Sequence, residues 1–236
     1  PNFFKNLNIT SPFIIAEIGV NHENSFETAI KIIDLAKKGG ADAVKFQSYK
    51  ADLLASKDSP AYWDTTKEET LNQNELFKKY DSFNEDDYRK LSEYCKKINV
   101  QFLSTPFDIY SVAYLESIVP FFKIASADIN NFQLLERISK TNKPIILSTG
   151  ASNIEEIDEA ISVREKKEKK DICLMHCILN YPTENINANL SMIKSLKEKF
   201  PERAVGYSDH TLPDKNMRSM TLAYLLGATI IEKHFT

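Results

Sequence analysis

Residues 41–48 read Ala-Asp-Ala-Val-Lys-Phe-Gln-Ser, a strand-like run in which, after Asp42, polar residues appear only toward the end, at Lys45, Gln47 and Ser48. Seven other short, strand-like runs repeat this pattern, and longer amphipathic segments separate them. The eight runs predict strands at 13–20, 41–48, 100–107, 121–126, 144–150, 172–177, 204–209 and 229–235. Apolar residues at three- and four-residue spacing predict intervening helices, among them 26–38, 85–97, 154–169 and 189–199.

This alternation is typical of a parallel sheet, because parallel neighbours need a crossover connection that is usually helical. Eight repeats is the number that closes a barrel, and polar strand ends mark the face where barrel enzymes place their active sites. A doubly wound sheet would give a similar alternation but usually carries a glycine-rich phosphate turn. Neither GxGxxG nor GxxxxGK occurs in the chain. The predicted fold is therefore α/β, a (β/α)8 TIM barrel.

The composition predicts one soluble, cytoplasmic domain that spans residues 1–236. A chain of this length with 42% hydrophobic residues can bury one sizeable core. The net charge of -3 offers no basic footprint for nucleic acid, and we interpret the Lys-rich run at 164–170 as a solvated helix end. No apolar stretch approaches the ~20 residues that span a bilayer, and no signal-peptide pattern is present. The three cysteines, Cys95, Cys173 and Cys177, are expected to be reduced.

Two features of the chain's organisation carry expectations. Residues 50–72 form a long polar segment that contains Tyr62 and Trp63, and it is interpreted either as a substrate-covering loop or as a surface insertion. The chain begins without Met and stops directly after the eighth predicted strand. We therefore expect a barrel that is truncated at that point.

Two lysines interrupt apolar strands near their carboxyl ends. Lys45 and Lys123 would meet at the mouth of a barrel and form an anion site suited to phosphate or carboxylate. Hydroxyl groups on neighbouring strands would add donors: Thr105, Ser126, Ser148 and Thr149. The alternative to an anion site is a structural role, in which either lysine pairs with a carboxylate of the protein. A Schiff-base aldolase remains a further alternative, because such enzymes also use a barrel lysine.

Two histidines, His210 and His234, stand at the ends of the last two predicted strands. Adjacent positions at a barrel mouth make them candidate ligands of a divalent metal, with Asp209 or Glu17 supplying an oxygen. Open coordination positions on such a metal would polarise a carbonyl group. His22 and His176 follow or end other strands and are secondary candidates.

Two carboxylates complete the candidate site. Glu17 lies within the apolar stretch Ile-Ile-Ala-Glu-Ile-Gly, where an unpaired charge would be costly. It is therefore expected to meet a metal, a lysine or a sugar hydroxyl. Asp128 comes just after the fourth predicted strand and is expected at the mouth.

Motifs along nearly the whole chain resemble those of the sialic acid synthase family, which includes N-acetylneuraminate, legionaminic and pseudaminic acid synthases. The matching stretches are AEIGVNH at 16–22, ADAVKFQ at 41–47, LSTPFD at 103–108, FKIAS at 122–126, ILSTG at 146–150, HC at 176–177, YP at 181–182, GYSDHT at 206–211 and EKHFT at 232–236. Each stretch alone is a weak signal, and their order and spacing together are specific.

The resemblance implies condensation of phosphoenolpyruvate with an amino sugar of the N-acetylmannosamine type, giving a nonulosonic acid and phosphate. It implies that phosphoenolpyruvate is held by Lys45, Thr105, Lys123, Ser126, Ser148 and Ser208. A divalent metal, Mn or Mg, would be bound by His210 and His234. The sugar would be faced by Gln47, Tyr181, Asp128 and Glu17, with Glu17 handling a proton or positioning water.

The chain also departs from the family pattern. Asn180 follows Leu179 in a segment where some relatives place a polar contact earlier, so that contact to phosphoenolpyruvate is expected to be displaced. Asp128 stands where several relatives have Glu, a region expected to tune the accepted sugar. The resemblance implies that the family continues into an antifreeze-like C-terminal domain, which lends an arginine across a swapped homodimer, and we expect residues 1–236 to comprise the barrel alone.

Two further functions stay open at the level of sequence. Related phosphoenolpyruvate-condensing barrels use several arginines for a phosphorylated sugar, whereas the five arginines here fall in predicted helices or loops. A truncated barrel that binds a ligand without turning it over is the alternative outside catalysis.

Overall fold

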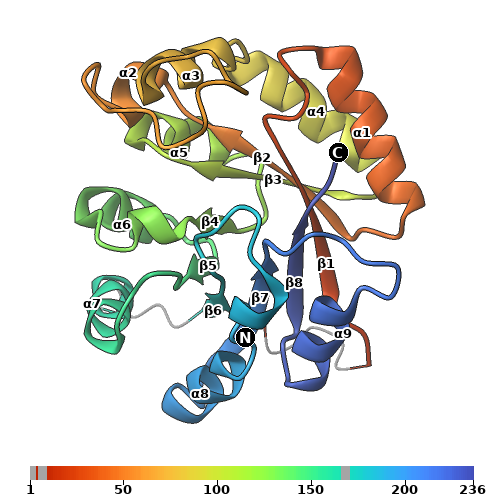
Figure 1. Cartoon of the computed structure of the whole chain (residues 1–236), viewed down its shortest axis with the longest axis vertical. Coiled ribbons are helices and arrows are strands. Elements are labelled where there is room, and N and C mark those ends of the chain that lie inside the picture. Colours follow the sequence, from red (N-terminus) through yellow and green to blue (C-terminus); the bar gives the residue numbers. More distant parts are fainter. Residues whose placement is uncertain (1–3, 5–9, 166–170) are drawn as a thin grey trace.

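Eight parallel strands curve into a nearly closed barrel with helices around its outside in the computed structural model, which describes residues 4, 10–165 and 171–236 (Figure 1). The strands are β1 Phe13–Gly19, β2 Ala43–Ser48, β3 Gln101–Pro106, β4 Phe122–Ile124, β5 Ile145–Ser148, β6 Ile172–His176, β7 Ala204–Asp209 and β8 Ile230–His234. Their hydrogen-bonded order is β3-β2-β1-β8-β7-β6-β5-β4, and β3 contacts β4 at the seam. The predicted (β/α)8 TIM barrel is confirmed.

Side-chain caps mark the starts of several of the helices. The α-helices are α1 Phe26–Lys38, α2 Ala51–Leu54, α3 Gln73–Lys79, α4 Glu85–Lys97, α5 Ile109–Leu115, α6 Phe132–Ser139, α7 Ile154–Glu165, α8 Met192–Lys199 and α9 Arg218–Leu225, with short 3-10 turns η2 Ser126–Asp128 and η3 Asn185–Asn187. Ser25 caps α1 by accepting from the Thr28 amide, and Asn84 and Asp87 form a capping box on α4. The predicted bounds of α1 and α4 are therefore confirmed.

Two predicted helix bounds need comment. Helix α8 begins at Met192 rather than at Asn189, because Asn189 has a left-handed φ of 46° that does not continue a helix. Helix α7 is described to Glu165, and the rest of its predicted length, with most of the Lys-rich run, lies outside the described residues.

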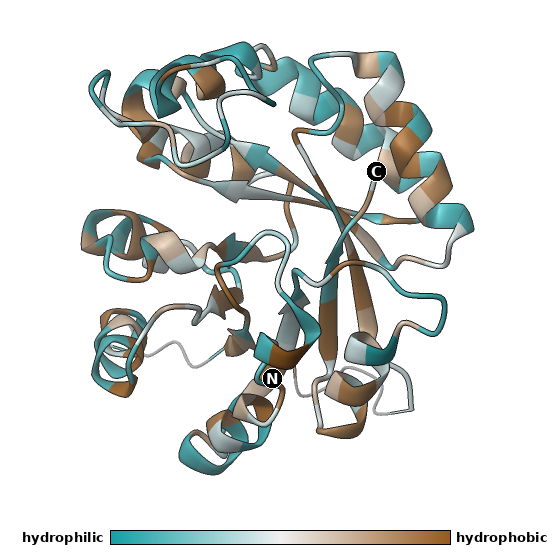
Figure 2. Cartoon of the chain, in the orientation of Figure 1, coloured by the Kyte–Doolittle hydropathy of each residue, from teal (hydrophilic) through white to brown (hydrophobic). Residues whose placement is uncertain are grey.

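Because side chains alternate along the strands, the core has two parts: one lies between the strands and the helices, and the other lies inside the barrel. Outward residues such as Ile18, Val44 and Phe46 pack against the helices, while inward residues fill the barrel. The inward cluster contains Phe4, Ile15, Ala43, Leu103, Phe121, Ile146, Cys173, Met175 and Ile230. Figure 2 shows this hydrophobic character along the strands.

The segment between β2 and α4 folds over the carboxyl ends of the strands (Figure 1). It contains α2, a bridge between Pro60 and Asn72, and α3. The Trp63 indole N–H lies 3.2 Å from both the Glu68 and the Thr70 carbonyl oxygens, which pins the turn that they form. None of the described helices is long and apolar enough to cross a bilayer.

Candidate active site

The barrel interior changes from apolar to polar within two residues along most of the strands. Ile15 is followed by inward Glu17, Ala43 by Lys45, and Ile230 by Glu232, since every second residue of a strand faces the same side. The polar members lie toward the carboxyl ends of the strands, where barrel enzymes place their chemistry. They surround a cavity of about 650 Å³.

This cavity brings together all twelve residues to which the family resemblance assigned a ligand. Its walls include Glu17, Lys45, Gln47, Thr105, Lys123, Ser126, Asp128, Ser148, Tyr181, Ser208, His210 and His234. These residues come from seven strands and from the segments that follow β4, β6 and β7. Their roles toward a ligand stay predictions, whereas their position around one cavity is a property of the structure.

Four charges of alternating sign form the floor of the cavity. Lys45 Nζ lies 2.5 Å from Glu17 Oε2 and 3.7 Å from Glu232 Oε2, and Lys123 Nζ lies 2.8 Å from Glu232 Oε1. The four side chains are at most 5% exposed. We call Glu17, Lys45, Glu232 and Lys123 the charge quartet. Both lysines thus have carboxylate partners, and the quartet carries no net charge when both carboxyl groups are ionised.

Burial and ion pairing shift the pKa values of the two carboxyl groups, Glu17 and Glu232, in opposite directions. Burial raises the pKa of Glu17 to about 7, with Lys45 opposing and Glu232 reinforcing the shift. Burial also acts to raise the pKa of Glu232, but Lys123, Lys45 and the Ser208 hydroxyl outweigh it and hold that pKa below its usual range. Glu17 is therefore the member of the quartet that can exchange a proton near neutral pH.

The lysine at the centre of the quartet is poorly suited to Schiff-base chemistry. Burial acts to lower the pKa of Lys45, but Glu17 and Glu232 outweigh it, so the pKa is raised. An amine nucleophile needs the opposite shift. Lys123 is held by its close ion pair with Glu232. These contacts disfavour the aldolase alternative.

Hydroxyl groups on neighbouring strands point into the same space. Lys45 Nζ donates to Thr105 Oγ1 at 2.9 Å, and Ser208 Oγ donates to Glu232 Oε1 at 2.8 Å. Ser126 Oγ accepts from the Gly150 amide at 2.9 Å and lies 3.0 Å from Cys177 Sγ. Thr149, also expected here, instead donates to the Met175 carbonyl and does not line the cavity.

The two candidate metal ligands face each other, with ring centroids 5.4 Å apart. His210 Nδ1 lies 2.5 Å from the Ile178 carbonyl oxygen, so this nitrogen is the donor and Nε2 keeps its lone pair. Burial lowers the pKa of His210 to about 4, which keeps the ring neutral at physiological pH. A neutral, oriented imidazole beside a second one suits a divalent transition metal.

The expected oxygen ligands are engaged elsewhere. Asp209 faces the outer side of the barrel, where it accepts from Lys233 at 3.0 Å, and Glu17 pairs with Lys45. Asp209 is thus wrong as a cavity ligand, because the alternation that turns His210 inward turns Asp209 outward. Among the described residues, no three His, Cys, Asp or Glu side chains cluster as a ready metal site.

The two secondary histidines lie outside the cavity lining. His22 is buried and stacks on Phe83 with ring centroids 4.1 Å apart. His176 is also buried, with Nε2 2.9 Å from the Ala188 carbonyl oxygen, and it stacks on Tyr207. Both serve packing at strand ends.

The side of the cavity assigned to a sugar mixes polar and aromatic groups. Gln47 Nε2 lies 3.3 Å from Glu17 Oε1, and Asp128 Oδ1 accepts a hydrogen bond from the Asn131 side-chain Nδ2 at 3.0 Å. The Tyr181 ring packs on His210 at 4.1 Å between centroids. Leu179 lines the cavity, whereas Asn180 is exposed outside it, in line with the expected displacement of Asn180.

Sequence reasoning missed several residues of this site. Glu232 is the main one, and its signal was available, because a carboxylate two residues before inward His234 must face the same side. The segment of residues 50–72 also reaches the cavity through Leu54 and Tyr62, as expected of a covering loop. Others on the walls are Tyr49, Gln73, Phe77, Phe107 and Cys177.

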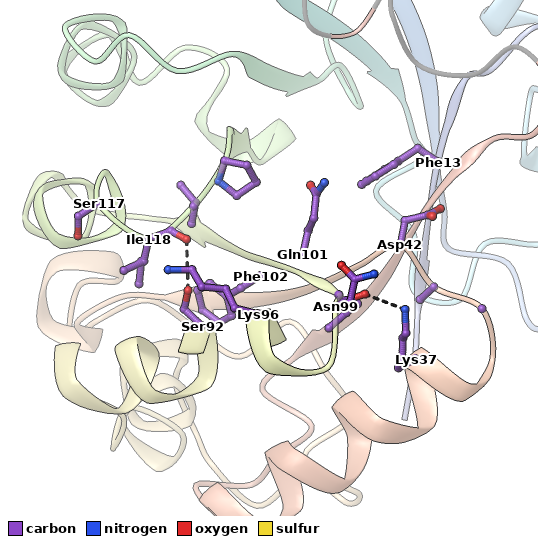
Figure 3. A pocket seen from close by; sticks show the side chains of 15 residues that line it. Phe13, Lys37, Asp42, Ser92, Lys96, Asn99, Gln101, Phe102, Ser117 and Ile118 are labelled. Carbon is purple, nitrogen blue, oxygen red and sulfur yellow. Dashed lines mark hydrogen bonds between the residues drawn. The ribbon is translucent and has the colours of Figure 1, made fainter. Parts of the chain in front are cut away.

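A second cavity, of about 720 Å³, lies at the opposite end of the strands (Figure 3). Several of its polar groups already have backbone partners: Lys37 Nζ donates to the Asn99 carbonyl at 2.7 Å, and Ser92 Oγ donates to the Ile118 carbonyl. Asp42 accepts from the Ile14 amide at 2.8 Å. It lacks the buried, convergent charges of the first cavity, so the first is the candidate active site.

Two curated proteins and one solved structure are similar to this chain. The chain is 42% identical over 229 residues to an N,N'-diacetyllegionaminic acid synthase of Campylobacter jejuni, covering 94% of this chain and 67% of that protein. It is 38% identical to an N-acetylneuraminate-9-phosphate synthase of Drosophila melanogaster, covering 97% of this chain and 61% of that protein. The crystal structure of the N-acetylneuraminic acid (sialic acid) synthetase of Leptospira borgpetersenii superposes with a TM-score of 0.85 at 37% identity, covering 97% and 74% of the two chains.

The chain thus spans roughly three fifths of the length of several curated relatives. By name, the Campylobacter and Drosophila relatives are synthases of N,N'-diacetyllegionaminic acid and of N-acetylneuraminate 9-phosphate, and a Helicobacter pylori relative is a pseudaminic acid synthase. The sequence model of the NeuB family matches residues 32–236, which include seven of the eight strands. The chain belongs to the NeuB family.

Proposed function

We propose that this chain is the barrel of a synthase that condenses phosphoenolpyruvate with an N-acetylmannosamine-type amino sugar. The products would be a sialic-acid-like nonulosonic acid and inorganic phosphate. The observation that carries the proposal is the buried charge quartet beside two neutral imidazoles in one cavity. Such an arrangement pairs an anion-binding half with a half that can activate a carbonyl group.

Phosphoenolpyruvate would occupy the side of Lys45 and Lys123, with hydroxyl contacts from Thr105, Ser126, Ser148 and Ser208. The quartet is neutral when both carboxyl groups are ionised, and it carries one net positive charge when Glu17 is protonated. Because the pKa of Glu17 is about 7, the positive form is accessible near neutral pH. Binding of the anion and protonation of Glu17 would therefore favour each other.

The reaction forms one C–C bond and, from water, one C–O bond, and it breaks the C–O bond to the phosphate group. C3 of phosphoenolpyruvate attacks the aldehyde carbon of the open-chain sugar, and water adds at C2 before phosphate leaves with its bridging oxygen. We assign to Glu17 the proton that the aldehyde oxygen needs, since it is the carboxyl group able to hold a proton near pH 7. Gln47, Asp128 and Tyr181 would orient the sugar.

A divalent metal, Mn or Mg, is proposed at His210 and His234. The residues fit such an ion, because His210 is neutral and its Nδ1 is fixed by the Ile178 carbonyl, leaving Nε2 available. When bound, the metal would supply Lewis-acid polarisation of the sugar aldehyde. The family resemblance also leads us to propose a homodimer completed by an antifreeze-like C-terminal domain.

The acceptor is proposed to lack a phosphate group. The only lysines among the described lining residues are Lys45 and Lys123, both ion-paired, and none of the five arginines lines the cavity. A phosphorylated sugar would need additional cations at its far end. The Drosophila relative is named for a 9-phosphate product, so acceptor choice is a point on which members of the family differ.

Phosphate release by the full-length protein tests the proposal. The panel would contain N-acetylmannosamine, its 6-phosphate and 2,4-diacetamido sugars, each with phosphoenolpyruvate and Mn²⁺ or a chelator. Metal-dependent release with an unphosphorylated acceptor is expected. Release only with the 6-phosphate would overturn the acceptor assignment, and no release with any sugar would overturn the synthase proposal.

A further inference from the structure

Behind the two imidazoles, on the outer side of β7 and β8, lies a buried polar cluster of Tyr207, Asp209, Thr211 and Lys233. Asp209 Oδ1 accepts from the Tyr207 hydroxyl at 3.0 Å and from the Thr211 amide at 2.9 Å. Asp209 Oδ2 accepts from Lys233 Nζ at 3.0 Å, and Lys233 also donates to the Thr211 carbonyl. Asp209 and Lys233 side chains are 3% and 12% exposed.

The outward residues that precede this polar cluster on the two strands are apolar. The outward neighbours on the same strands, Val205 and Ile231, are at most 2% exposed and belong to the main hydrophobic core. Desolvating two charges costs about as much as their attraction returns, so stability alone does not account for a buried pair in this layer. A role in fixing the arrangement of the strands is the better explanation.

The pair sits where the strand ladder ends. Asp209 and Lys233 are the last register partners of β7 and β8, which lie next to each other in Figure 1. His210 follows that last pair on β7, and His234 is aligned with Glu17 of β1 on the other side of β8. The Asp209–Lys233 contact, with the adjoining contact of Lys233 to Thr211, therefore joins the two strands at the level of the two imidazoles.

We propose that Lys233 and Asp209 are positioning residues that set the separation of His210 and His234, and through it the affinity for a divalent metal. This inference rests on the metal assignment of the proposed function. The side chain of each residue points away from the cavity, while its backbone carries a ligand on the next position of the chain. Loss of the pair lets the ends of β7 and β8 separate without removing either imidazole.

Titration of the full chain with Mn²⁺, followed by the EPR signal of free Mn²⁺, tests this role without an activity readout. Lys233→Met is expected to weaken Mn²⁺ binding at least tenfold, the size typical of lost support behind a metal ligand. Asp209→Asn should do the same, because it keeps the oxygen that accepts from Tyr207 and Thr211 but loses the charge. Lys233→Arg should restore most of the affinity.

Arg203→Met is the matched control. Arg203 precedes β7 at its opposite end and pairs with Glu165, so its loss removes an ion pair far from the mouth. It should lower the melting temperature without changing Mn²⁺ affinity. Unchanged affinity in both Lys233→Met and Asp209→Asn would overturn the positioning role.

His234→Ala separates failure of this inference from failure of the metal assignment. If the unaltered chain binds Mn²⁺ and His234→Ala abolishes binding, the assignment stands and the Lys233 result decides the inference. If the unaltered chain binds no Mn²⁺, or His234→Ala binds as well as the unaltered chain, the metal assignment falls and the inference falls with it.

Discussion

The barrel interior has a lower and an upper layer of side chains, which lie two residues apart along the same strands. The two layers have different roles. The lower layer, with Ile15, Ile146 and Ile230, is apolar and at most 1% exposed. The upper layer, with Glu17, Ser148 and Glu232, is buried as deeply but carries charge and hydroxyl groups. Burial alone therefore does not distinguish core from site. What distinguishes the layers is the chemical type of the buried side chains. Substitutions in the apolar lower layer should lower the free energy of unfolding, whereas removal of polar groups from the upper layer should chiefly lower activity.

The largest expected effect on turnover comes from His234, which lies at the rim of the cavity above the upper layer. His234→Ala should reduce metal-dependent turnover on the order of a thousandfold, because Lewis-acid polarisation is worth several kcal/mol. The side chain is exposed, so the free energy of unfolding should change by less than about 1 kcal/mol. Steady-state phosphate release and urea unfolding measure the two quantities. Retained turnover with the same metal dependence would contradict the metal assignment.

The sharpest comparison uses two positions on β5. Ile146→Ala should lower the free energy of unfolding by about 2–5 kcal/mol, because it leaves a cavity in the lower layer. Turnover per folded molecule should be retained. Ser148→Ala should lower stability little and raise KM for phosphoenolpyruvate about tenfold or more, the worth of a hydrogen bond to a charged group. Equal effects of both changes on KM would contradict the division into two layers.

Sequence predicted this division well where it depended on local pattern. Eight polar-ended strands and the caps at Ser25 and Asn84 are local signals, and the structure agrees with them. Pairing across the barrel is not local. That Glu232 joins Lys45 and Lys123 depends on how eight strands close, although its inward direction follows from His234 two residues later.

The errors of sequence reasoning have a shared physical origin. Asp209 and Thr149 were expected in the cavity because they are polar and stand at strand ends, yet both face outward. Proximity along the chain was given more weight than alternation, and in a strand adjacent residues face opposite sides. The short helices α2 and α3 were missed because their segment is polar and owes its shape to contacts such as those of Trp63.

The pH dependence of stability should also separate the layers. The pKa of Glu17 is about 7 in the folded chain against an ordinary value of 4.5, so the folded state holds a proton that the unfolded state has released between those values. The contribution of Glu17 to the free energy of unfolding should therefore fall as pH rises from about 4.5 to about 7. The fall should be on the order of 3 kcal/mol and should level off at higher pH.

Glu17→Gln isolates this contribution, because the amide does not titrate. His210, with its pKa lowered to about 4, gives stability that rises with pH between about 4 and 6.5, but it does so in both proteins. The difference between the two curves from urea unfolding should therefore report Glu17. Curves that stay parallel between pH 4.5 and 7 would show that Glu17 ionises normally in the folded chain.

The smallest expected effect lies outside both layers, on the covering segment. The Tyr62 ring is 74% exposed and lines the cavity, so it can contact a bound sugar while contributing little to folding. Tyr62→Ala should change the free energy of unfolding by less than about 0.5 kcal/mol and raise KM for the amino sugar a few-fold. Tyr110→Ala is the matched control, since Tyr110 is 68% exposed and lies outside the cavity lining. If the two variants had the same KM for the sugar, the segment would be a surface insertion; if only Tyr62→Ala raised it, the segment would form a third layer, which binds substrate without supporting the barrel.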